Sequence, residues 1–76
     1  MIVEITTPDK EIFSGNASMV NLPGVDGSFE ILENHANMVA ALKRGTIKLI
    51  SEGETFFFEI NGGVVEVLRN KVSILA

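Results

Sequence analysis

The chain lacks cysteine, tryptophan and tyrosine, and its 76 residues include one histidine and two prolines. The absence of cysteine excludes disulfide scaffolds, thiolate zinc sites and thiol catalysis, and it fits a cytosolic protein. No apolar run approaches the roughly 18–20 residues of a membrane-spanning helix. Residues 1–4 have no basic stretch before an apolar one, so no secretory signal is expected.

Positive charge is also scarce, because six basic residues face ten acidic ones, for a net charge of −4. A nucleic-acid surface needs clustered Lys and Arg, yet only Lys43 and Arg44 are adjacent. Stacking platforms for single strands need aromatic side chains beside basic groups. The aromatic run 56–58 instead lies between Glu54 and Glu59, so the sequence argues against nucleic-acid binding.

Apolar residues make up 46% of the chain, which together with the modest charge argues against disorder. The length allows one domain, residues 1–76. Surface scaling predicts a folded accessible area of roughly 4,500 Å² and burial of about 60% of the unfolded surface. A small but genuine core is therefore expected.

Short apolar segments separated by Gly, Asn, Asp and Pro recur along the whole chain, which is typical of an all-β sandwich or barrel. The connections are short, which favours antiparallel neighbours. We predict a small antiparallel two-sheet β-sandwich. The candidate strands are residues 2–7, 11–14, 17–22, 28–32, 46–50, 55–60, 64–68 and 71–75.

Two segments carry more specific predictions. Asn61 and Gly62 accept positive φ, so they suit a tight hairpin turn, and Gly63 indicates a bulge or a close backbone approach. Residues 34–42 are rich in alanine, and Asn34 suits a helix cap, so a helical turn is an alternative there.

Some apolar residues occupy the polar positions of otherwise alternating strands. Phe57 takes the opposite face of its strand from Phe56 and Phe58, and Val64 takes the opposite face from Val65. Either curved sheets bury these side chains at their ends, or they form a patch that binds a partner.

Residues suited to catalysis are few. His35 follows Glu30 and Glu33, and an imidazole beside carboxylates suits acid–base or metal chemistry. No second His completes a good metal site, so a polar loop residue at a contact surface is the favoured interpretation of His35. The glycines at 24 and 27 lack the Lys-Ser/Thr ending of a phosphate-binding loop. We predict no enzyme activity, cofactor or small-molecule substrate.

An ordered series of motifs resembles the N-terminal β-sandwich domain of the epsilon subunit of F-type ATP synthase, and the likeness runs the whole length of the chain. The segments that carry it are Thr7-Pro8, Phe13-Ser14-Gly15, Leu22-Pro23-Gly24, Asp26-Gly27, His35-Ala36, Leu42-Lys43-Arg44-Gly45, Gly62-Gly63-Val64-Val65-Glu66-Val67 and Asn70-Lys71-Val72-Ser73-Ile74-Leu75-Ala76.

The chain departs from the family pattern in the segment expected to meet the rotor ring. Ser28 replaces an acidic residue, Glu30 replaces a common Gly, and residues 33–34 replace Pro-Gly. Glu30 or Glu33 would then supply the missing charge. Typical members continue into a helical hairpin, whereas this sequence ends at Ala76, so we expect no hairpin-type autoinhibition.

The resemblance implies a non-catalytic central-stalk subunit of a proton-translocating ATP synthase, peripheral on the cytoplasmic side of the energy-transducing membrane. It would bind the gamma subunit and the c-ring and help couple ion flow to ATP synthesis. The implied gamma-interface residues are Thr7, His35 and Ala40, and the implied ring-facing residues are Asp26, Gly27, Ser28 and Glu30. The alternative is a free-standing β-sandwich adaptor for another protein.

Overall fold

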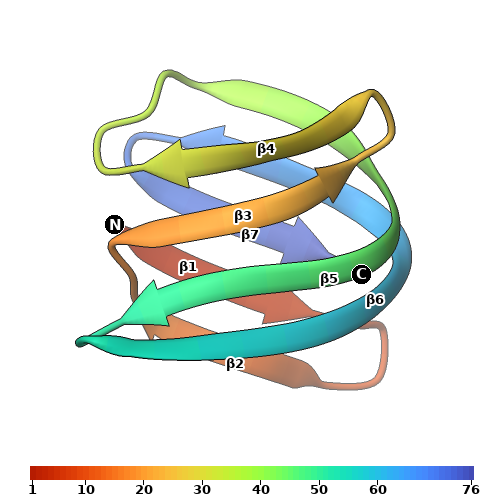
Figure 1. Cartoon of the computed structure of the whole chain (residues 1–76), viewed down its shortest axis with the longest axis horizontal. Coiled ribbons are helices and arrows are strands. Elements are labelled where there is room, and N and C mark those ends of the chain that lie inside the picture. Colours follow the sequence, from red (N-terminus) through yellow and green to blue (C-terminus); the bar gives the residue numbers. More distant parts are fainter.

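The computed structural model describes all residues, 1–76, and consists of β-strands joined by short turns and loops (Figure 1). It contains no helix, and so none that could cross a membrane. The strands are β1 (Ile2–Thr6), β2 (Glu11–Asn16), β3 (Met19–Gly24), β4 (Gly27–Leu32), β5 (Met38–Ser51), β6 (Glu54–Leu68) and β7 (Lys71–Leu75).

All seven strands belong to one hydrogen-bonded sheet, in the order β2-β1-β7-β6-β5-β3-β4. The sheet folds over itself because β5 and β6 form one long, bent hairpin that runs through both layers (Figure 1). The first layer holds β2, β1 and β7. Its strand β7 pairs with residues 64–68 of β6. The second holds β4 and β3, which pairs with residues 48–50 of β5. The predicted all-β sandwich is confirmed, with the difference that its two layers belong to one continuous sheet rather than to two sheets.

The bend of β6 lies at Gly62 and Gly63, where the sequence predicted a hairpin turn. That prediction is wrong, because the strand continues through both glycines while paired with β5. Their φ angles of 142° and 143° explain the misreading, since such backbone is found mostly in turns. The predicted close approach is confirmed: a Cβ on Gly63 would collide with the Leu75 carbonyl oxygen and lie 3.0 Å from the Ala76 Cα.

The bend also shifts the alternation of side chains by one residue. Ile60 and Val65 are five positions apart, yet both are buried, whereas strict alternation would put them on opposite faces. Leu42 and Ile47 on β5 show the same change. The long hairpin therefore keeps an apolar face toward the core in both layers.

Strands β1 and β7 are parallel neighbours, with Ile2 opposite Lys71 and Thr6 opposite Leu75. The prediction of antiparallel pairing throughout is wrong at this one place. Short turns impose antiparallel pairing only on strands that follow each other in the chain. The first and last strands carry no such constraint.

Residues 34–42 do not form the helical turn that was considered. Asn34 has a φ of 60° in a tight turn, and the chain enters β5 at Met38. Residues 38–42 pair with residues 63–67 of β6. This ladder outweighs the helix preference of a short alanine-rich segment, which is weak in isolation.

Fifteen hydrophobic residues form the core between the layers. The predicted alternations are confirmed, because Ile47, Leu49, Val72 and Ile74 are all buried. The accessible area of 4586 Å² matches the value expected from chain length. The core consists of Met1, Val3, Ile5, Ala17, Val20, Leu22, Ile31, Leu42, Ile47, Leu49, Ile60, Val65, Val67, Val72 and Ile74.

Three phenylalanines hold strand β2 of the first layer against β6 of the second. The Phe13 ring centroid lies 6.0 Å from that of Phe56 and 5.9 Å from that of Phe58. These separations are within the favourable range for tilted aromatic pairs. Phe56 and Phe58 point toward the core as predicted, and Phe57 points outward with 65% of its surface exposed.

Candidate functional site

The β3–β4 hairpin brings together all four residues that the sequence assigned to a ring-facing surface. Asp26 lies in its two-residue turn, and Gly27, Ser28 and Glu30 follow on the edge strand β4. All four are exposed. The Ser28 hydroxyl donates a hydrogen bond to the side-chain oxygen of Asn21, 3.1 Å away, which ties the two strands together on their outer face. One hairpin therefore presents the whole group.

The three residues assigned to a gamma interface do not come together. Thr7 follows β1, beside the end of the chain, where the Ala76 N–H donates to the Thr6 carbonyl. The Thr7 hydroxyl accepts the N–H groups of Asp9 and Lys10 and so stabilises the β1–β2 turn. His35 lies at the opposite end of β1, in the loop that meets the β6–β7 turn.

His35 is half-buried, and its Nδ1 lies 2.8 Å from the carbonyl oxygen of Ala36. Ala40 is also half-buried and packs on the core from β5. No group of three His, Asp or Glu side chains is arranged to hold a metal ion.

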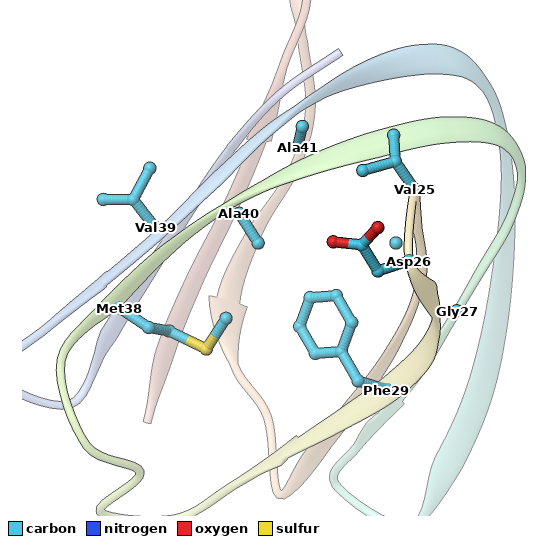
Figure 2. A pocket seen from close by; sticks show the side chains of 9 residues that line it. Val25, Asp26, Gly27, Phe29, Met38, Val39, Ala40 and Ala41 are labelled. Atoms are coloured by element: carbon cyan, nitrogen blue, oxygen red, sulfur yellow. The ribbon is translucent and has the colours of Figure 1, made fainter.

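A pocket of about 350 Å³ lies between the β3–β4 turn and the start of β5. The Phe29 ring and the Asp26 carboxylate point into it, whereas Val39 points away (Figure 2). The pocket is lined both by Ala40, which was assigned to the gamma interface, and by Asp26 and Gly27, which were assigned to the c-ring. The lining residues are Gly24, Val25, Asp26, Gly27, Phe29, Met38, Val39, Ala40 and Ala41.

Glu33 is engaged within the domain. Its carboxylate pairs with the N-terminal ammonium of Met1 and accepts a 3.2 Å hydrogen bond from the Asn70 amide. The hydrogen bond from the ammonium, and then that from Asn70, lower the pKa of the Glu33 carboxyl. Asn70 also accepts the N–H of Asn34 at 2.8 Å. The network joins three segments of chain, so Glu33 has a structural role, whereas Glu30 has no ion-pair partner.

The two apolar residues that broke the strand alternation lie on different outer faces. Val64 is on the first layer, opposite Leu75 on β7 and Ala41 on β5. The N–H of Val25 donates to the Ala41 carbonyl at 3.0 Å and continues this line. We call these four residues the Val64 row. Their side chains are exposed, by 43% for Val64 and 64% for Leu75.

Phe57 is on the second layer, in a line of polar residues. It lies opposite Lys48 on β5, which lies opposite Asn21 on β3, and Asn21 lies opposite Glu30 on β4. We call these four residues the Phe57 row. The single patch suggested by Phe57 and Val64 is thus two separate environments.

Sequence reasoning missed Leu75, Ala41 and Val25 as surface residues. For Leu75 a signal was available, because it takes the outward position in the alternation that buries Val72 and Ile74. Ala41 was hidden in the segment considered for a helix, and Val25 in a turn. Their proximity depends on strand order, which the sequence alone does not give.

Comparison with known proteins identifies relatives over the whole chain. The model of the β-sandwich domain of the ATP synthase delta/epsilon chain matches residues 1–76. The ATP synthase epsilon chain of Pelotomaculum thermopropionicum is 39% identical over 74 residues, which are 97% of this chain and 55% of that protein. That of Chlorobium limicola is 43% identical over 74 residues, 96% of this chain and 84% of that protein. The chain thus spans about half the length of the first relative.

Two solved structures share the fold. A chain of the Euglena gracilis mitochondrial ATP synthase, solved with its OSCP, F1 and c-ring, superimposes with a TM-score of 0.93 at 23% identity, over 100% of this chain and 49% of that one. A chain of the central stalk and c-ring of the Tetrahymena thermophila enzyme gives 0.84 at 22% identity, over 97% and 60%. At these identities the likeness establishes the fold.

Proposed function

Because the chain belongs to the β-sandwich family of ATP synthase delta and epsilon chains, we propose that it is a central-stalk subunit of a proton-translocating F-type ATP synthase. The observation that carries the proposal is the match over residues 1–76, together with 43% identity to an ATP synthase epsilon chain of which this chain covers 84%. In this role the protein binds the gamma subunit and the c-ring and rotates with them. It contributes no catalytic group.

The mechanical properties of the fold support this role. A subunit that transmits torque must keep its shape between two contact surfaces. Here the β5–β6 hairpin runs through both layers, and the layers share one apolar core. Close-packed interiors have low compressibility and transmit strain. The domain is therefore suited to pass rotation from one partner to another.

The exposed β3–β4 hairpin is the surface we assign to the c-ring, through Asp26, Gly27, Ser28 and Glu30. It combines a tight turn with two carboxylates that have no ion-pair partner. Polar loops of a membrane ring would meet such a surface at the membrane boundary. The subunit is then peripheral on the cytoplasmic side of the membrane.

The gamma subunit would contact the first layer and its borders, near Thr7, His35 and Ala40. These residues are spread along the layer, so together they describe an extended contact.

The test is a pull-down with tagged protein from native membranes in mild detergent, read by mass spectrometry. We expect stoichiometric gamma, alpha, beta and c subunits. Recovery of the tagged chain alone, with intact ATP synthase left behind, would contradict the proposal and favour a free-standing β-sandwich adaptor.

A further inference from the structure

The Val64 row is a line of apolar side chains that runs across neighbouring strands on the outer face of the first layer. Leu75, Val64 and Ala41 are cross-strand neighbours, and Val25 follows at the β3–β4 turn. Residues opposite one another on one face are close enough for a single partner to contact them together. The row is thus a continuous apolar contact, unlike Phe57, which stands among polar neighbours.

The two borders of the Val64 row carry charged residues of opposite sign. On one side Glu66 lies opposite Ser73 on β7 and opposite Val39 on β5. The Glu66 carboxylate is exposed and has no ion-pair partner. On the other side lies exposed Lys43, opposite Gly62. A complementary partner therefore carries an apolar stripe with Lys or Arg along the border that meets Glu66.

The spacing of the row identifies the shape of that partner. Neighbouring strands are about 4.8 Å apart, and an α-helix advances 5.4 Å per turn. An apolar side chain on each successive turn would therefore meet each strand in succession. An extended segment repeats its side chains on one face only every 6.6 Å or so, which does not match the strands. A helix lying across the strands fits the row better.

We propose that the Val64 row is the docking face for an amphipathic helix of the gamma subunit, with basic residues along its acidic border. This inference rests on the proposed function, which supplies the identity of the partner. A second copy of this chain is a poorer occupant, because each copy carries a net charge of −4 and the copies repel each other.

The experiment measures the affinity of purified gamma subunit for the full chain by calorimetry. We compare Val64→Asp and Leu75→Asp with Phe57→Asp, a matched control that puts the same charge on the other outer face. The row variants are expected to weaken binding by at least about 30-fold, as central apolar contacts do, and the control by less than about threefold. Glu66→Lys is expected to weaken binding and to reduce its dependence on salt.

Thermal melts of the same proteins separate binding from folding. If Val64→Asp melts well below Phe57→Asp, Val64→Thr replaces it, since it keeps the β-branched shape and removes apolar character. Equal loss of affinity in row and control variants would overturn the inference and leave the proposed function standing. Wild-type protein that does not bind gamma would contradict the proposed function, and the inference with it. A wild-type dimer that Val64→Asp dissociates would overturn the inference in favour of a second copy.

Discussion

The two outer faces of the sandwich differ in what surrounds their exposed apolar residues. On the first layer, Val64 has Leu75 and Ala41 as cross-strand neighbours. On the second layer, Phe57 has Lys48 beside it and Asn21 beyond, although Phe57 is the larger and more exposed side chain. Scattered surface hydrophobics are normal in soluble proteins, whereas contiguous ones mark interaction sites.

The difference shows that exposure alone does not identify a contact surface. Both residues lie on the same strand, β6, seven positions apart. The bend at Gly62 and Gly63 lies between them and puts the two halves of the strand into different layers. Strand register then determines which exposed residues have apolar neighbours.

The largest expected effect is on the bend itself. Gly63→Ala places a Cβ against the backbone of Leu75 and Ala76, at a φ that disfavours any side chain. We expect a loss of about 3 kcal/mol in the free energy of unfolding, measured by urea denaturation. Gly62→Ala is the matched control, because its φ is nearly identical but its nearest contact is 3.5 Å away, at the Leu42 carbonyl oxygen. We expect about 1.5 kcal/mol there, and equal losses would show that the close approach is unimportant.

The second prediction compares the loss of stability when a phenylalanine that packs between the layers is removed with the loss when an exposed one is removed. Phe13→Ala removes the ring that contacts both Phe56 and Phe58 across the layers. We expect about 2 kcal/mol of destabilisation, since the ring is half-buried rather than fully buried. Phe57→Ala should change stability by less than about 0.5 kcal/mol. Chemical denaturation of both variants tests the pair, and a larger loss for Phe57→Ala would refute the assignment of faces.

A third prediction concerns how the stability of the domain changes at acidic pH through Glu33, at one end of the first layer. The pKa of Glu33 is lowered by hydrogen bonds from the Met1 ammonium and then from Asn70. A carboxyl whose folded pKa lies below its unfolded value stabilises the fold above the unfolded value, about 4.3 for Glu, and loses this contribution as pH falls through the folded value.

Melting temperatures of the wild type and Glu33→Gln should therefore converge as the pH is lowered from about 6 to about 3, with the wild type more stable at the upper end. Glu30→Gln, which removes an exposed carboxylate with no ion-pair partner, is the control and should follow the wild-type curve. A constant gap between wild type and Glu33→Gln at every pH would contradict the assignment.

The smallest expected effect on stability is at the centre of the Val64 row. Val64→Thr keeps a β-branched side chain on the strand, so the free energy of unfolding should change by at most about 0.5 kcal/mol. Its affinity for gamma should fall nevertheless. A stability loss comparable to that of Phe13→Ala would show that Val64 belongs to the core and would remove the basis of the proposed docking face.

Local patterns predicted much of the fold. Alternation correctly identified the buried faces of residues 46–49 and 71–74 and the outward position of Phe57. It failed where tertiary pairing decides the conformation, as at residues 34–42, whose turn is held by Asn70 and whose strand is held by β6. It also failed at Gly62, because positive φ occurs in a strongly bent strand as well as in a turn.

The candidate surfaces were harder to predict than the core. The β3–β4 hairpin residues are sequence neighbours, so their grouping followed directly from the motif. The Val64 row joins β5, β6, β7 and the β3–β4 turn, and the parallel β1–β7 pair fixes the position of Leu75. Nothing local in the sequence specifies that order of strands.

Thiol labelling in the assembled complex tests the central claim most directly, because the chain has no cysteine of its own. Single variants Val64→Cys and Phe57→Cys would be incorporated into the ATP synthase and exposed to a maleimide, with each isolated protein as the reference. Docking through the Val64 row predicts that assembly slows labelling of Val64→Cys at least about tenfold, in line with burial at an interface centre, and leaves Phe57→Cys nearly unchanged. Equal labelling of both variants in the complex, or protection of Phe57→Cys alone, would contradict it.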